Sequence, residues 1–197
     1  MIARGLILVF MMLTVSCAVG DKRTPEMTPS PQGTVQDFGP EADALLDAVI
    51  HLGDMPHGWT EVRGAGLPLS ATSEQCGAAT SAAFAGFINS ATGERMAVNI
   101  GRYDDAECVI DFTSRTLDEV ADNQGLLIDR ASHWGDQTVA WSGPRFELPF
   151  VYLIIRRGDL ITALDYEVQP GVAPQFPEEI ARTAVLRLDR FLANGLP

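Results

Sequence analysis

Three segments of the chain repeat apolar residues at helical spacing, and the first covers residues 40–52. One face of this segment carries four large apolar side chains, those of Leu45, Leu46, Val49 and Ile50. Pro40 stands at its start and Gly53 follows its end. Proline suits the first position of a helix and glycine suits the position after its last turn, so the pattern predicts a helix over residues 40–52.

Two further helices are expected, over residues 104–120 and from Pro177 to just before Gly195. Asp104 is placed to cap the first of them, with Glu107 at the capping-box position. Its apolar stripe is expected to consist of Val109, Phe112, Thr116 and Val120. The last helix opens with two glutamates, and its expected buried stripe consists of Ile180, Ala184, Leu188 and Phe191.

Between these helices, alternating or continuous apolar runs predict strands. They fall at residues 59–62, 80–89, 95–103 and 138–143, and as two strands within 149–168 around a tight turn at Arg157, Gly158 and Asp159. The run from Phe150 to Ile155 is apolar on both faces, which is typical of a central strand. The coarse order α, β, β, β, α, β, β, β, β, α predicts a single α+β domain over residues 40–197, with a twisted antiparallel sheet of about six or seven strands and three packed helices.

The charge of the chain limits its partners. The formal net charge is -12, from 14 basic and 26 acidic side chains. Nucleic acids and anionic membrane surfaces are bound through positive potential, so we expect no nucleic-acid partner. We expect no cofactor either, because the sequence contains no motif for one.

The first 16 residues are predicted to be a signal peptide. Arg4 precedes an apolar run from Leu6 to Val15, which is too short to span a membrane as a helix. The segment resembles a bacterial lipoprotein leader, in which a small residue, here Ser16, precedes the cysteine that becomes the lipidated first residue. The resemblance implies a membrane anchor at Cys17, although Thr14 stands where that leader usually has leucine.

An alternative is ordinary secretion, with cleavage after residues 18–20, AVG, near Gly20. Residues 17–39 are rich in proline, threonine, glycine and charge and hold almost no large apolar residue. Such a composition predicts a disordered segment, which suits a tether between a membrane and a domain and suits equally the tail of a secreted protein.

The other two cysteines, Cys76 and Cys108, lie in the predicted domain. One anchor cysteine and one pair are what a lipoprotein with a single disulfide in an oxidising compartment requires. The alternative is two buried free thiols. No Cys-x-x-Cys or paired Cys/His spacing indicates zinc, so no metal site is predicted.

Two stretches of the domain are similar to a known group of proteins. Residues 44–62, ALLDAVIHLGDMPHGWTEV, and residues 151–166, VYLIIRRGDLITALDY, resemble parts of actinobacterial-type exported lipoproteins and kinase sensor ectodomains. This resemblance implies a twisted antiparallel sheet with helices on it, distantly like the PsbP fold, and a role in the cell envelope. It implies no ligand and no site residue.

No residue pattern indicates catalysis. The three histidines, His51, His57 and His133, have no metal-binding spacing, and there is neither a Gly-x-Ser-x-Gly nor a Ser-x-x-Lys motif. His133 stands beside Trp134 and Asp136, a mixture that suits either a cleft or a surface loop. The three tryptophans suit either the core or a pocket for an apolar ligand or glycan, and they are Trp59, Trp134 and Trp141.

Two other sequence features have simple structural explanations. The acid pairs at 104–105 and 178–179 fall at predicted helix starts, where acids are favoured. The RGD tripeptide at 157–159 coincides with the predicted turn, which explains it better than integrin binding does.

The sequence therefore predicts a membrane-anchored envelope lipoprotein with a non-enzymatic domain that binds an unknown small molecule or protein. The alternatives are an extracytoplasmic hydrolase and a structural or assembly partner of an envelope complex. Catalytic and ligand-binding residues are not assigned at this stage.

Overall fold

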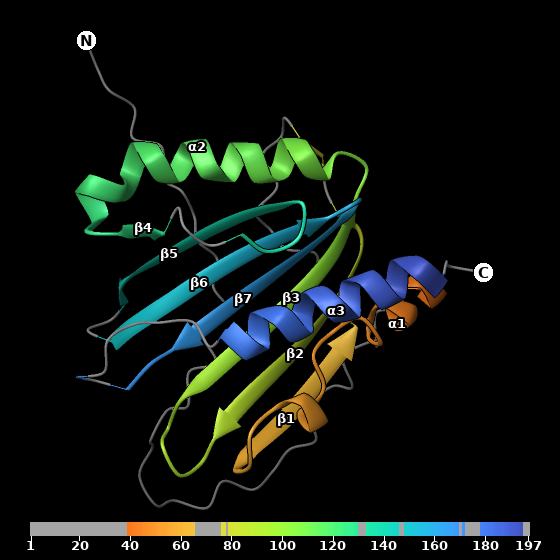
Figure 1. The fold of residues 1–197 in the computed structure, drawn as a ribbon, viewed down its shortest axis with the longest axis horizontal. Helices are drawn as coiled ribbons and strands as arrows, with labels where there is room; N and C mark the ends of the chain where they lie inside the picture. Colours follow the sequence, from red (N-terminus) through yellow and green to blue (C-terminus); the bar gives the residue numbers. More distant parts are fainter. Residues whose placement is uncertain are drawn as a thin grey trace, which may run out of the picture. The chain divides into compact units, whose positions relative to one another are not determined.

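Seven strands form one antiparallel sheet in the described part of the chain (Figure 1). The computed structural model describes residues 39–65, 76–77, 79–129, 133–145, 148–169, 171 and 178–194. The strands are β1 (Trp59–Ala65), β2 (Ala79–Asn89), β3 (Arg95–Tyr103), β4 (Leu127–Asp129), β5 (Gln137–Arg145), β6 (Leu148–Arg157) and β7 (Leu160–Glu167). Their order across the sheet is β1-β2-β3-β7-β6-β5-β4.

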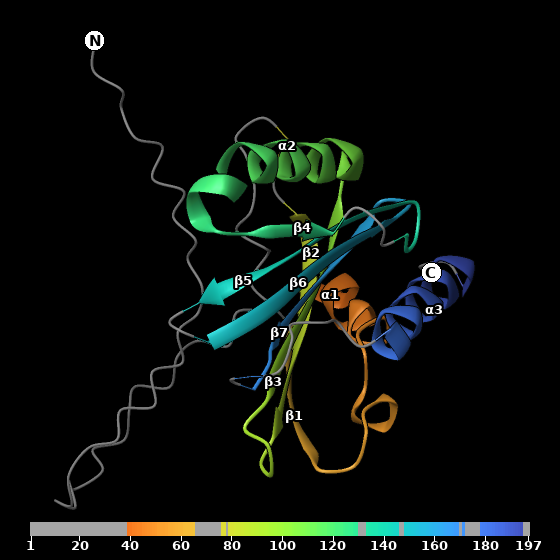
Figure 2. The same ribbon diagram turned by 60° about the vertical axis from the view of Figure 1, so that its left-hand side comes forward.

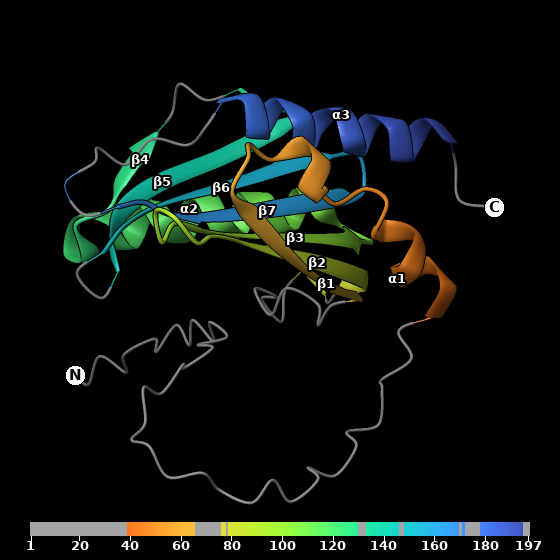
Figure 3. The same cartoon turned by 90° about the horizontal axis from the view of Figure 1, so that it is seen from below.

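The helices are divided between the two faces of this sheet (Figures 2 and 3). They are α1 (Gly39–Leu45), the short 3-10 helix η1 (Leu52–Asp54), α2 (Ala106–Gln124) and α3 (Glu178–Asn194). α2 lies on one face, whereas α1 and α3 lie on the other. The predicted α+β class, with an antiparallel sheet and three α-helices, is confirmed for the described residues.

The sheet is built from two antiparallel units that meet at β3 and β7. Short turns connect β2 to β3 on one side and β6 to β7 on the other, whereas β3 and β7 are far apart in the sequence. At this seam, Arg95 pairs with Glu167 and Arg102 pairs with Leu160. The two-residue turn between β6 and β7 contains Gly158 at φ 61°, as the sequence predicted.

Each face of the sheet has its own apolar core, because side chains alternate along every strand. The α1/α3 core takes from the central strands Met96, Val98, Ile100, Val151, Leu153, Ile155, Leu160 and Leu164. The α2 core takes from the sheet Tyr103, Val139, Trp141, Phe150, Ile154, Ile161 and Ala163. The sheet residues from Phe150 to Ile155 therefore supply both cores, which confirms the central position predicted for this run.

The predicted helix over residues 40–52 is wrong in its second half, because α1 ends at Leu45. The backbone N–H groups of Leu46, Asp47 and Ala48 donate to carbonyls three residues earlier, which tightens the chain into turns. Ala48, Val49 and Ile50 are then buried consecutively. Three successive side chains cannot all face one core from a regular helix, so burial of this run favours the irregular path.

The predicted start and stripe of α2 also need correction. Asp105, rather than Asp104, caps the helix, since its carboxylate accepts from the Cys108 N–H at 2.8 Å. The third residue after this cap is Cys108, so Glu107 does not occupy the capping-box position. Only Val109 of the predicted stripe is buried, and the buried residues are Ala106, Val109, Ile110, Leu117 and Ala121.

This shift has a packing reason. The stripe follows the side of α2 that faces Trp141 and Ile154 in the α2 core, and Phe112 packs at its margin. In α3 the predicted stripe is closer to the observed one, because Ile180, Ala184 and Leu188 are buried. Ala181 joins them there, and Phe191 is half-buried against the α1/α3 core.

Candidate functional site

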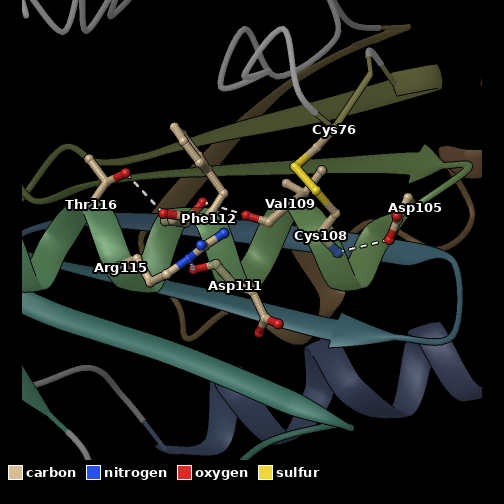
Figure 4. Close-up of a disulfide and its surroundings, with 9 residues drawn as sticks. Cys76, Asp105, Cys108, Val109, Asp111, Phe112, Arg115 and Thr116 are labelled. Carbon is tan, nitrogen blue, oxygen red and sulfur yellow. Dashed lines mark hydrogen bonds between the residues drawn. A yellow bond between two sulfur atoms is a disulfide. The ribbon is translucent and has the colours of Figure 1, made fainter.

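A disulfide joins α2 to the residues just ahead of β2 (Figure 4). The Cα atoms of Cys76 and Cys108 are 5.6 Å apart, and the two cysteines are separated by 32 positions in the sequence. Cys76 is buried in the α2 core, and Cys108 packs against that core from the first turn of the helix. The predicted pairing is therefore present, and it attaches the start of α2 to the sheet. Cys17 lies outside the described residues, so its lipidation stays a prediction.

A small half-open cavity lies where β5 extends past its neighbour β4. β4 pairs only with residues 140–142 of β5, so Gln137, Thr138 and Val139 lie beyond the last β4 pair. The cavity has a volume of about 260 Å³. Its described lining comes from α2, from β4, from the residues ahead of β5 and from β5 itself, and it consists of Ser114, Ile128, Asp129, His133, Trp134, Gly135, Asp136, Gln137, Thr138, Val139 and Ala140.

Several polar groups in the cavity wall are held by partners within the domain. The Thr138 hydroxyl accepts from the Trp134 N–H at 2.7 Å and donates to the Trp134 carbonyl. The Gln137 side chain donates to Asp111 on α2 and accepts from Arg156 on β6. These bonds fix the wall, because those of Thr138 hold the residues ahead of β5 and those of Gln137 tie the start of β5 to α2 and β6.

Gly135 is needed where the chain turns toward β5. Its φ is 66°, which disfavours other residues. A Cβ atom at this position would lie 2.4 Å from the Arg156 carbonyl oxygen. A side chain there would push the residues ahead of β5 away from β6, so glycine sets the position of His133 and Trp134 beside the cavity.

Asp136 connects this wall to the turn between β6 and β7. Its carboxylate accepts from the Gly158 N–H at 2.8 Å and from the Arg157 guanidinium. The hydrogen bond from the Gly158 backbone is the main cause that holds the pKa of Asp136 below its ordinary value, and Arg157 adds to it. Asp189 on α3 binds the same guanidinium, and the two carboxylates together raise the pKa of Arg157.

We expect the Asp136→Asn variant to be less stable than the wild type at neutral pH and to lose this difference in acid. The folded-state pKa of Asp136 lies below its ordinary value of 3.8, so the ionised form favours the folded state. This contribution is complete above about pH 5 and disappears as the pH falls through the folded-state pKa. Melting temperatures of the two proteins between pH 2 and 7 would show the gap closing. The exposed Glu119→Gln variant is the control, and a gap that does not change with pH would contradict the assignment.

The three histidines do not meet. The backbone N–H of His51 donates to the Asp54 carboxylate at the start of η1, and His57 is exposed in the turn before β1. His133 is exposed and lines the cavity. The sequence left a cleft and a surface loop open for this residue, and the structure places it in a loop that borders a cavity. No cluster of three or more potential metal ligands is found among the described residues.

The three tryptophans have different environments. Trp141 is buried in the α2 core, with its ring centroid 4.4 Å from that of Tyr152. Trp59 is half-buried against the α1/α3 core. Trp134 also packs against that core, but it lines the cavity as well, so of the three it is the one placed to contact a ligand.

The RGD tripeptide is engaged within the domain. Arg157 pairs with Asp136 and Asp189, and Asp159 pairs with Arg102 at 3.2 Å. The turn is therefore held by ion pairs of the protein's own, which supports the structural explanation of this motif. The acid pairs lie at the starts of α2 and α3, where Asp105 caps and Glu178 pairs with Arg182 at 3.0 Å.

Several residues that line the cavity were not predicted from the sequence, because no motif or pattern distinguishes them. Ser114 lies on α2, Ile128 and Asp129 lie on β4, and Gln137 begins β5. Neither the Ser114 hydroxyl nor the His133 imidazole makes a hydrogen bond to a described residue, and in particular the two are not bonded to each other. The prediction of a hydrolase therefore gains no nucleophile–base pair here, and it stays a prediction.

The described residues define an α+β domain with a small half-open cavity at one edge of its sheet. No family model, curated protein or solved structure matches the chain. No helix among the described residues is both long and apolar enough to cross a membrane.

Proposed function

We propose that the chain is an exported bacterial lipoprotein that is anchored to the cell membrane by a lipid on Cys17. Its domain binds a ligand at the cavity beside Trp134 and carries out no catalysis. The observation that supports export most directly is the disulfide between Cys76 and Cys108. Disulfides of this structural kind form and persist in oxidising compartments, whereas cytosolic thiols are kept reduced.

The arrangement of the disulfide supports a structural role for it. Both sulfur atoms belong to residues that pack in or against the α2 core, and they hold the first turn of α2. A bond that closes 32 positions of chain at this place stabilises the fold without a redox reaction. The predicted leader before Cys17 and this disulfide therefore both favour a domain that lies outside the cytosol.

The cavity supports binding rather than catalysis. Its walls are fixed by the bonds of Thr138, Gln137 and Asp136, whereas Ser114 and His133 have hydrogen-bonding groups that no described residue uses. Most of the described lining is polar, and its larger apolar side chains are those of Ile128, Trp134 and Val139. A concave site in which placed polar groups lie beside apolar side chains can orient a small ligand.

Expression of the full chain in a bacterial host tests the anchor. We expect the wild type in the membrane fraction, with an intact mass that includes the acyl groups on Cys17. The Cys17→Ala variant should lose that mass and leave the membrane, because it has no thiol to which the lipid can be attached.

Two further observations complete this test. The Thr14→Leu variant restores the leucine usual three residues before the cysteine, and we expect it to be acylated at least as fully as the wild type. A soluble, unmodified wild-type product that begins at Asp21 would contradict the anchor and would establish cleavage after Gly20 instead.

A further inference from the structure

The charged, polar and apolar groups around the cavity at the start of β5 limit the chemical class of ligand that can bind there. This inference rests on the proposed binding function of the same site. The charged groups in the wall already have partners, since Asp136 is bound by Arg157 and the Gly158 N–H. Asp129 is not free either. The Asp136 carboxylate is therefore already paired and is not available to select a cationic ligand.

Anionic ligands are disfavoured for a related reason. The described lining contains no lysine or arginine, and both arginines near the wall are engaged. Arg156 donates to Gln137, and Arg157 binds Asp136 and Asp189. The net charge of -12 further disfavours an anion at long range. The ligand that fits best is neutral.

The remaining groups of the cavity suit hydroxyls beside an apolar surface. Ser114 and His133 offer a hydroxyl and an imidazole, each able to donate and to accept, and neither is used by a described residue. Trp134, which is half-buried, lines the cavity together with Ile128 and Val139, and these residues provide its apolar part. An aromatic residue near groups that bond hydroxyls suits a ring with polar edges and an apolar face.

The size of the cavity agrees with a single ring. Its volume of about 260 Å³ equals that of about nine waters in the liquid. This is just below the range of pockets that hold drug-sized molecules, and one side is open. We propose that the cavity beside Trp134 binds one neutral pyranose ring, such as a terminal sugar of an envelope glycan, through Ser114 and His133.

Three pyranoses of different charge test this proposal. The exported full chain, purified from the fraction that contains it, is titrated with glucose, glucosamine and glucuronate. Saturation-transfer NMR detects the bound ring. We expect saturable binding of glucose and about tenfold weaker binding of glucuronate, because the described lining contains no cation for its carboxylate and the net charge of the chain disfavours an anion.

Matched variants assign the binding to this cavity. Ser114→Ala and His133→Ala should each weaken glucose binding about three- to tenfold, the usual effect of one lost hydrogen bond. His57→Ala removes an exposed histidine outside the cavity lining and should leave binding unchanged. Circular dichroism and melting temperatures establish that each variant is folded.

Three results would overturn the proposal. They are the absence of saturable binding by any of the three rings, binding that is unaffected by both Ser114→Ala and His133→Ala, and binding of glucosamine in clear preference to glucose. Fractionation of the same preparation reports separately on export, so a failure of the sugar site is distinguished from a failure of the anchor.

Discussion

Replacing both Cys76 and Cys108 with alanine lowers the free energy of unfolding by about 3 to 4 kcal/mol, which is the expected cost of opening a loop of this length. The bond closes 32 positions of the chain and attaches the first turn of α2 to the residues ahead of β2. Without it, the unfolded chain gains conformational freedom and the folded state does not. Thermal denaturation should show a melting temperature that is lower by about 10 °C.

The matched control uses the same bond in the reduced state. In the Cys17→Ala background, reduction should lower the melting temperature about as much as the double substitution does, and it should not affect the double variant. Alkylation before reduction should leave the intact mass unchanged, and alkylation after reduction should add two adducts. Two adducts before reduction would mean that the thiols are free.

Truncating Leu164 to alanine in β7 should destabilise the domain by about 2 to 5 kcal/mol. Leu164 is fully buried, at 0% exposure, in the middle of the α1/α3 core. The lost methyl groups leave a cavity that neighbouring strands cannot fill, since the strand pairs on both sides of β7 hold their positions. Urea denaturation measures the change.

Leu127→Ala in β4 is the matched control for this substitution. Leu127 is also a strand leucine, but 69% of it is exposed. Its truncation removes little buried surface, so we expect a change within about 0.5 kcal/mol. Similar losses from the two variants would mean that β7 does not occupy the centre of the sheet.

Local patterns were sufficient to predict most of the fold. The alternation in residues 95–103 and the continuous apolar run from Phe150 to Ile155 predict strands because a strand in this sheet must supply either one core or both. The turn at Gly158 depends on the backbone preference of a single residue, which can be read directly from the sequence. The preference of proline for a helix start likewise predicted a helix where α3 begins at Glu178, although Pro177 itself lies outside the described residues.

The errors occurred where a distant element decides the local structure. Nothing within residues 40–52 shows that the segment must leave the helix after Leu45, because its path is stabilised by Arg187 of α3, which binds Asp54 and the Asp47 carbonyl. The buried stripe of α2 likewise depends on where Trp141 lies in the sheet. Helical periodicity leaves the stripe uncertain by one residue, and tertiary packing then selects it.

The cavity was predictable only in part. The mixture of His133, Trp134 and Asp136 suited either a cleft or a surface loop, and these residues lie ahead of β5 and line the cavity. Ser114 and Asp129 come from other elements, and their approach depends on β4 being shorter than β5. A sequence pattern cannot indicate the space that a short edge strand leaves beside a longer neighbour, because that space follows from strand pairing.

The seam between β3 and β7 determines the order in which the domain can fold. The Tyr166 hydroxyl donates to Glu94 across 72 positions, so this pairing requires most of the chain to be present. The local hairpins and the disulfide can form earlier, whereas β3 and β6 each keep an open edge until β7 arrives. Pairing at such long range slows folding, and open strand edges favour aggregation. A chain that stops before residue 160 therefore has open strand edges at β3 and β6 in addition to the outer edges at β1 and β4.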